Sequence, residues 1–268
     1  MMHTGIITLT TDFGLTDPYV GAMKGVILSL NPQVRIIDIS HQVGPGDIQA
    51  AARLLTETYS FFPTGSIHLG VVDPGVGSSR RAIGVYAKGH LFVGPDNGLF
   101  WPILSQDPDA QIIHLTKSAY FRPQVSHTFH GRDLFAPVAA HLSAGVDLHR
   151  MGTVITDPVA FKIHTVKQGA HTLTGRVTTI DRFGNLITNI EENVLNRFLG
   201  AHQPLIQLGG RVINTLHHHY ADVPPGEPLA LFSSSGHLEI AVNQGRAAEC
   251  LGIEEEEIHQ LEVEIERI

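Results

Sequence analysis

Two aspartates stand at positions from which they could contact a bound ligand. Asp12 comes directly after the β-rich segment 6–11, and Asp73 directly after the strand-like segment 66–72. In open α/β sheets, ligands bind outside the carboxyl ends of the strands. The types and places of these residues therefore predict a small-molecule site at one edge of a sheet.

Each polar segment near this edge also has an ordinary structural interpretation. Asp12 could be a turn aspartate, and Asp-Pro-Gly at 73–75 is favourable turn chemistry. Arg80 and Arg81 could be surface charges, and Phe-His-Gly-Arg-Asp at 129–133 could be a helix start with a local ion pair. Residue types and spacing alone therefore leave the reaction open.

Seventeen histidines make a metal site the first alternative to weigh. The run 217–219 is His-His-His, but consecutive residues on a strand point to opposite faces, so the three side chains cannot easily meet one ion. The sequence has no His-x-x-x-His helix pattern and no cysteine pair. We therefore favour exposed or hydrogen-bonded histidines and expect no metal and no cofactor, with a metal hydrolase as an alternative.

The elements that position Asp12 and Asp73 alternate between strand and helix. The segments 6–11, 34–39 and 66–72 are predicted buried strands. Asp17 and Pro18 are expected to start the first helix, and Asp47 is expected to cap the second. This order predicts an α/β domain with a central mixed, mostly parallel sheet. One face of the first helix should carry Val20, Met23, Ile27 and Leu30.

The pattern changes after about residue 158, where short strands and tight turns follow one another. This predicts a second, small and mostly antiparallel β-barrel domain. The expected domains are 1–157 and 170–268, with a linker at 158–169. The predicted strands of the second domain are 175–180, 186–190, 205–208, 229–232, 237–242 and 261–268.

Composition excludes several classes of partner. The formal net charge of −8, without a stripe of basic and aromatic residues, argues against nucleic acid. No run of about 18 apolar residues is present, so we expect no membrane span. Cys250 is the only cysteine, and the N-terminus lacks the features of a signal peptide. These observations predict a cytoplasmic protein.

Six segments, taken in order along nearly the whole chain, resemble the S-adenosylmethionine hydroxide adenosyltransferase family, which is related to the fluorinase and chlorinase enzymes. They are Thr-Asp-Phe-Gly at 11–14, Asp-Pro-Gly-Val-Gly-Ser-Ser-Arg-Arg at 73–81, Gly-Pro-Asp-Asn-Gly at 94–98, Phe-His-Gly-Arg-Asp at 129–133, Asp-Arg-Phe-Gly-Asn at 181–185 and Ser-Ser-Gly at 234–236.

The resemblance implies a role for each matching residue. Asp73, Arg80 and His130 match the family's water-activating catalytic residues, and Asp12 matches the aspartate that binds both ribose hydroxyls. Phe183 and Asn185 match residues that contact the adenine. The remaining implied substrate-binding positions, around the methionine part for the most part, are Asp17, Tyr19, Gly131, Asp181, Ser234 and Ser235. Two of them depart from a relative, which has serine at Tyr19 and arginine at Ser235.

The implied activity is hydrolysis of S-adenosylmethionine to adenosine and methionine, by attack of an activated water at C5′. The resemblance also implies a homotrimer with sites between subunits. A halogenase is one alternative, but a carboxylate at Asp73 would repel halide while accepting a proton from water. A non-catalytic protein that binds adenosine or S-adenosylmethionine is the other.

Overall fold

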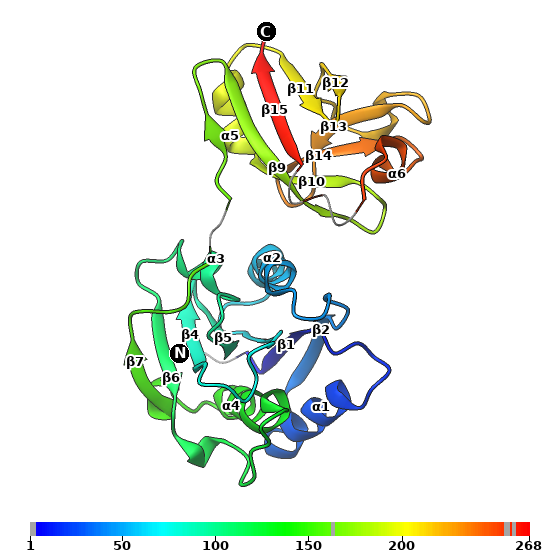
Figure 1. The fold of residues 1–268 in the computed structure, drawn as a ribbon. Helices are drawn as coiled ribbons and strands as arrows, with labels where there is room; N and C mark the ends of the chain where they lie inside the picture. Colours follow the sequence, from blue (N-terminus) through cyan, green and yellow to red (C-terminus); the bar gives the residue numbers. More distant parts are fainter. Residues whose placement is uncertain (1–3, 162–163, 255–257, 259–260) are drawn as a thin grey trace. The chain divides into compact units, whose positions relative to one another are not determined.

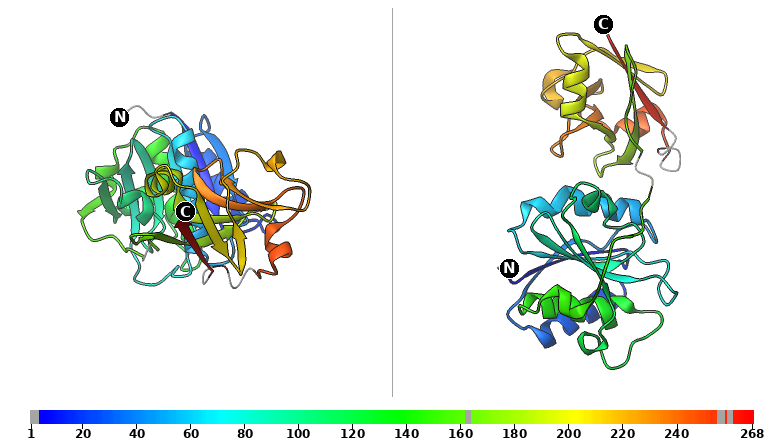
Figure 2. Two further views of the ribbon diagram at one scale, coloured as in Figure 1. Left: turned by 90° about the horizontal axis from the view of Figure 1, so that it is seen from above. Right: turned by 90° about the vertical axis from the view of Figure 1, so that its left-hand side faces the viewer.

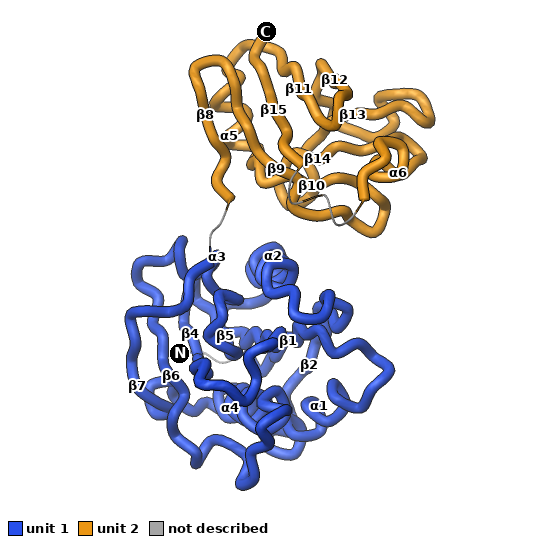
Figure 3. The backbone as a smooth tube through the Cα atoms, in the orientation of Figure 1, with its two compact units in different colours: residues 1–161 blue, residues 162–268 orange. Residues whose placement is uncertain are grey.

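The computed structural model describes residues 4–161, 164–254, 258 and 261–268. The chain divides into two compact units, residues 1–161 and residues 162–268 (Figure 3). Each unit has its own hydrophobic core.

Unit 1 is built on a seven-stranded sheet with the order β2-β1-β3-β5-β4-β6-β7. β2, β1, β3 and β5 run parallel, whereas β4 pairs antiparallel with β5 and β6, and β6 with β7. The sheet is therefore mixed, as predicted. The strands are β1 (Ile6–Thr11), β2 (Arg35–Ser40), β3 (Ile67–Val71), β4 (Ala82–Ala87), β5 (His90–Pro95), β6 (Gln111–Leu115) and β7 (Gly152–Ile155).

Helices cover both faces of this sheet. Figures 1 and 2 show α1 and α4 on one face and α2 and α3 on the other. Separate clusters of buried apolar side chains lie on the two faces, which explains why β1, β3 and β5 are buried almost throughout. The helices are α1 (Tyr19–Leu30), α2 (Ile48–Thr58), α3 (Trp101–Leu104) and α4 (Ala136–Ser143).

Three local expectations for unit 1 are wrong. β2 lies at the edge of the sheet, where it pairs with β1 alone, and its residues are exposed or half-buried. Leu30 is 45% exposed, since it ends the helix beyond the core. Asp17 does not cap α1: the cap position is Pro18, and the helix begins at Tyr19.

By contrast, the Asp47 carboxylate accepts the Ala50 N–H at 2.9 Å and caps α2 as expected.

Unit 2 is a nearly closed antiparallel barrel, as predicted. The strand order is β12-β11-β15-β9-β10-β14-β13, and β8 pairs with β9. The chain after β12 bridges back to β13 through Leu216 and Ala230, which brings the two ends of the sheet together. The strands are β8 (Lys167–Gln168), β9 (Thr172–Ile180), β10 (Leu186–Glu191), β11 (Pro204–Leu208), β12 (Arg211–Ile213), β13 (Pro228–Phe232), β14 (His237–Val242) and β15 (Glu262–Arg267).

Unit 2 also contains two helices that the sequence analysis did not predict. α5 (Glu192–Leu199) buries Leu195, Phe198 and Leu199 against the barrel core, and α6 (Ala247–Leu251) follows β14. Their apolar residues recur at helical spacing, but the helices are short, which makes them hard to distinguish from strands by pattern. Among all the described helices of both units, none is long and apolar enough to cross a membrane.

A pair of buried histidines lies inside unit 1. His68 on β3 is fully buried, and its Nδ1 lies 2.9 Å from the Thr8 Oγ1 while its Nε2 lies 3.2 Å from the His90 Nδ1. Burial, together with the neighbouring His90, lowers the pKa of His68 to about 3. A charged His68 would lose its solvation without gaining an anionic partner among these contacts, so the folded protein holds it neutral.

We predict that this histidine makes unit 1 less stable in acid. The unfolded chain takes up a proton near pH 6.5, whereas the folded chain resists it until about pH 3. The contribution is therefore fully present above pH 6.5, and about 1 kcal/mol should be lost per pH unit between pH 6 and pH 4. Urea unfolding measured across this range should show the slope, and His68→Gln should reduce it. An equivalent change at the exposed His218 is the control. Identical slopes for wild type and His68→Gln would contradict the prediction.

Candidate active site

An arginine joins the two other members of the implied catalytic set. Asp73 lies in the loop after β3, and Arg80 comes just before β4. The Arg80 Nε donates to the Asp73 Oδ1 at 2.8 Å, and its Nη2 donates to the Asp73 Oδ2. The same Nη2 lies 2.8 Å from the Nδ1 of His130. The structure thus brings together all three residues, which are separated by up to 57 positions (73 to 130) in the sequence.

The contact with Arg80 fixes the tautomer of His130. A guanidinium has no acceptor atom, so Nδ1 of His130 must accept this hydrogen bond and the neutral ring carries its hydrogen on Nε2. Burial, and next the positive charge of Arg80, lower the pKa of His130. His130 is therefore neutral at pH 7 and presents an N–H donor on the side away from Arg80.

The buried Asp133 holds the segment that carries His130. His130 directly precedes a π-helical turn, η3 (Gly131–Phe135). The Asp133 carboxylate accepts from Arg122 and Arg132 and from the backbone N–H of Ser126. Burial alone would raise the pKa of Asp133, but these donors hold it at about 2. The local ion pair of the ordinary structural interpretation is thus present, and the contacts of Asp133 tie the loop before His130 to the helix after it.

A glycine allows the two catalytic loops to approach each other. Gly77 has φ +77°, and a Cβ at this position would lie 2.2 Å from the carbonyl oxygen of His127. Any other residue would clash with this backbone atom. The loop that begins at Asp73 therefore lies directly against the loop that precedes His130.

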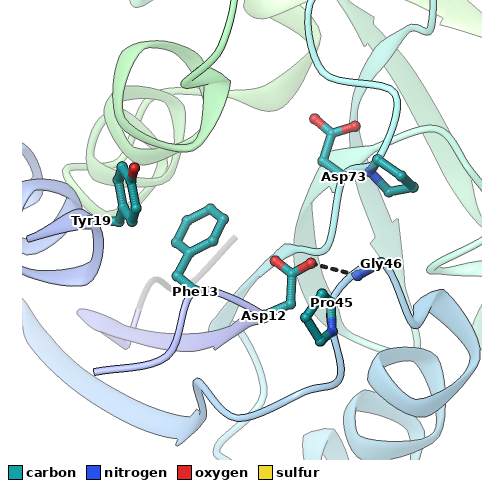
Figure 4. Close-up of a pocket in the computed structure, with 7 residues that line it drawn as sticks. Asp12, Phe13, Tyr19, Pro45, Gly46 and Asp73 are labelled. Atoms are coloured by element: carbon teal, nitrogen blue, oxygen red, sulfur yellow. Dashed lines mark hydrogen bonds between the residues drawn. The ribbon is translucent and has the colours of Figure 1, made fainter. Parts of the chain in front are cut away.

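A pocket of about 460 Å³ lies beside Asp73 (Figure 4). Asp12 and Asp73 reach it from the ends of β1 and β3, which are neighbouring parallel strands with Thr11 paired to Val71. The Asp12 Oδ2 accepts the Gly46 N–H at 2.8 Å. The prediction of two strand-end carboxylates at one sheet edge is thus realised in the structure. The lining residues are Asp12, Phe13, Tyr19, Pro45, Gly46, Asp73 and Pro74.

The other predicted residues of unit 1 divide between the pocket and its surroundings. Tyr19, the first residue of α1, lines the pocket and is 44% exposed. Asp17 is exposed and is not a lining residue. Gly131 is buried, and a Cβ there would lie 3.3 to 3.4 Å from the rings of Phe129 and Phe13.

In unit 2, the predicted residues lie on two tight turns. Asp181 shapes the first turn: its Oδ1 accepts the N–H groups of Phe183 and Asn185, and its Oδ2 accepts from the Asn185 side chain at 3.2 Å. Asn185 is 5% exposed, whereas Phe183 is 74% exposed. On the second turn, the Ser235 Oγ lies 2.9 Å from the Ser233 Oγ, and Ser234 is its neighbour.

The histidine run of unit 2 does not form the strand assumed in the sequence analysis. Residues 218 and 219 lie in a bend, and Nδ1 atoms of His217 and His219 lie 4.0 and 3.6 Å from the Asp222 carboxylate. The argument from opposite strand faces was therefore wrong. Over the described part of the chain, no group of three or more histidine, cysteine, aspartate or glutamate side chains has the arrangement of a metal site.

Four lining residues were missed as site residues by the sequence analysis. Phe13 stood next to Asp12 in the same motif, which was the available signal. Pro74 likewise stood next to Asp73 in its motif. Pro45 and Gly46 enter the pocket only because the loop before α2 folds onto the end of β1. No local sequence pattern predicts that contact.

Fold and site define a two-unit protein with an acidic ligand pocket at the edge of an α/β sheet. A model of the SAM hydroxide adenosyltransferase N-terminal domain matches residues 7–152, and a model of the C-terminal domain matches residues 175–259. The chain belongs to the SAM hydroxide adenosyltransferase family, as the resemblance indicated.

Two named relatives and one solved structure are similar to the chain. It is 39% identical over 256 residues to an (R)-S-adenosyl-L-methionine hydrolase of Salinispora tropica, over 94% of this chain and 96% of that protein. It is 28% identical over 272 residues to a fluorinase of Actinoplanes sp., over 89% and 91% of the two chains. The solved structure of an uncharacterized conserved protein from Thermotoga maritima matches with a TM-score of 0.90 and 36% identity, over 97% of this chain and all of that one.

We predict that Arg80→Gln raises the pKa of His130. The substitution removes a nearby positive charge that lowers this pKa, and it leaves the Asp73 carboxylate without its partner. An NMR titration of the His130 ring would measure the change. Arg81→Gln is a matched control, because Arg81 pairs instead with Asp96 and Asp157. An unchanged titration in Arg80→Gln would show that Arg80 does not set the charge state of His130.

Proposed function

We propose that this protein hydrolyses S-adenosyl-L-methionine to adenosine and L-methionine. The observation that carries the proposal is the position of Asp73, which lines the pocket while Arg80 holds both its oxygens and contacts His130. Membership of the family, and 39% identity to a relative named for this activity, support it.

The chemistry requires little from the protein except control of water. A sulfonium is a good leaving group, so the bond from sulfur to C5′ breaks without an acid to protonate the departing thioether. Water is a weak nucleophile and must be held in line behind C5′. As the C5′–O bond forms, the electron pair of the C5′–S bond moves to sulfur. One proton of the water then leaves, and the products are adenosine and methionine.

Asp73 is suited to accept that proton. His130 uses its Nδ1 for Arg80, so its remaining N–H donates to the water oxygen rather than taking a proton. Each Asp73 oxygen has a second acceptor position beside the one used by Arg80. An alkylated water is a far stronger acid than water itself. A carboxylate therefore suffices as the acceptor once the new bond is largely formed.

The charge of the pocket distinguishes hydrolysis from halogenation. Asp73 lines the pocket and is the group that would face the nucleophile. Its carboxylate would repel a halide, whereas neutral water can donate a proton to it. The fluorinase relative is also the more distant, at 28% identity.

We assign the remaining contacts from the family resemblance. Asp12 binds the ribose hydroxyls, and the Gly46 N–H keeps one of its oxygens in place. Phe183 and Asn185 contact the adenine. Gly131 is a further substrate-binding residue, and Asp17, Tyr19, Asp181, Ser234 and Ser235 bind the methionine part. The Asp181 carboxylate also shapes the turn that carries Phe183 and Asn185.

We predict that Asp73→Asn and His130→Ala each lower turnover while the substrate still binds. Positioned groups that orient water or accept its proton contribute about 10²–10⁴-fold to rate. Adenosine release from S-adenosylmethionine, measured by chromatography, would show the loss, and adenosine affinity measured by calorimetry would show that binding survives. A substitution at the exposed Asp109 is the control. Wild-type turnover in both variants would refute the assignment.

We also propose a cytoplasmic homotrimer whose sites combine residues of neighbouring subunits. The single cysteine of the sequence fits a reducing compartment. The 74% exposure of Phe183 suits a side chain that becomes covered when a ligand or another subunit binds.

We predict that mixing two inactive variants restores activity in part. Asp73→Asn damages the water-binding part of the site, and Asn185→Ala damages the adenine-binding part. If the two parts come from different subunits, some mixed trimers contain one site in which both parts are wild type. Activity should be assayed after subunit exchange is proven by mass spectrometry of the mixed species. Continued inactivity after proven exchange would show that each chain builds its own site.

A further inference from the structure

Three aromatic rings form a cluster at one side of the Asp12–Asp73 pocket. The ring centres of Phe13 and Tyr19 lie 5.8 Å apart, those of Phe13 and Phe129 lie 5.8 Å apart, and those of Tyr19 and Phe129 lie 5.2 Å apart. Phe13 and Tyr19 line the pocket, and Figure 4 shows Phe13 between Tyr19 and the two carboxylates.

A glycine leaves room for the rings of this cluster to pack closely beside the pocket. Gly131 lies close to two of them, and a Cβ there would be 3.3 Å from the Phe129 ring and 3.4 Å from the Phe13 ring. Phe129 already has a cation beside it, because the Arg132 guanidinium carbon lies 5.0 Å from its ring centre. Tyr19 is 44% exposed although it belongs to an aromatic cluster, so its ring is open to a ligand.

The charges around the rings favour a cationic ligand. The pocket contains the Asp12 and Asp73 carboxylates, and no lysine or arginine is among the lining residues that the structure describes. Arg80 compensates Asp73, which leaves about one negative charge at Asp12. Aromatic rings attract cations through their negative faces, and a desolvated cation gains more from them than a hydrated one. A sulfonium is weakly hydrated and carries its charge on sulfur and the attached carbons.

We infer that Phe13 and Tyr19 are specificity residues that recognise the sulfonium charge of the substrate and so discriminate it from the neutral thioether. The inference rests on the proposed function and extends it. These two rings would let methionine leave easily. When the sulfonium becomes a thioether, the attraction between ring and cation disappears. The charge of Asp12 attracts any cationic ligand to the pocket, and the rings add an attraction for charge at sulfur.

The test compares two non-reacting analogues by calorimetry. Sinefungin has a carbon in place of the sulfur and carries a protonated amine where the sulfonium methyl group would be, whereas S-adenosylhomocysteine has a neutral sulfur. Both keep the same adenosine, ammonium and carboxylate groups. We expect wild type to prefer sinefungin, and Tyr19→Leu and Phe13→Leu each to reduce the preference by about 2- to 30-fold, the range of a cation–ring contact. The affinity for S-adenosylhomocysteine should change much less.

Two further variants separate the ring from other contributions. Tyr19→Phe keeps the ring and removes the hydroxyl, so it should keep the preference. Leu15→Ala changes an exposed apolar residue of the same loop that does not line the pocket, and it should also keep the preference. Because Tyr19 is half-exposed, Tyr19→Leu should fold, and adenosine affinity verifies that the rest of the site is intact.

The outcomes distinguish this inference from the proposed function. If wild type hydrolyses S-adenosylmethionine but the leucine variants weaken both analogues by the same factor, the rings only fill space and the inference is overturned. Loss of preference in Tyr19→Phe would assign the effect to the hydroxyl and would overturn it as well. If wild type binds neither analogue and releases no adenosine, the proposed function itself fails.

Discussion

The guanidinium of Arg80 is the group on which the geometry of the site depends. One side chain donates to both oxygens of Asp73 and to Nδ1 of His130, and so connects the loop after β3 with the turn before α4. The side chains of Arg80 and Asp73 are only 10% and 5% exposed, so the interaction is screened weakly by solvent. A lysine could not replace it, because a single ammonium cannot reproduce the planar, two-sided set of donors.

The rest of unit 1 places this arginine and its partners. The parallel strands β1 and β3 direct Asp12 and Asp73 to the same edge, and the antiparallel strand β4 returns the chain so that Arg80 meets Asp73 from the following segment. Asp133 holds the segment that carries His130 in place, because its carboxylate accepts hydrogen bonds from Arg122 and Arg132. The mixed sheet is therefore part of the site, because a wholly parallel connection would need a long crossover between Asp73 and Arg80.

The parts of this arrangement that were predictable are those encoded in short segments. Alternation of strands and helices, the Asp47 cap and the strand-end positions of Asp12 and Asp73 follow from local patterns. The exposure of β2 does not, because an edge strand and a central strand can share the same apolar residues. Nor does the contact from Gly46 to Asp12, which joins residues 34 positions apart. The grouping of Asp73, Arg80 and His130 came from resemblance alone, since their sequence segments also have ordinary turn and surface interpretations.

The pairing of Thr11 with Val71 has a consequence for which molecules can react. Asp12 follows the first of these residues directly, and Asp73 comes two positions after the second, so the hydrogen-bond ladder fixes where the two chain segments leave the sheet. Gly46 and Arg80 then hold the two carboxylates in place. A ladder cannot stretch to suit a longer ligand. If one carboxylate binds the sugar and the other binds the water, the sheet limits the distance between the bound sugar and the bound water. A nucleoside with one extra methylene before its sulfur would bind at the sugar and leave its reactive carbon out of line with the water.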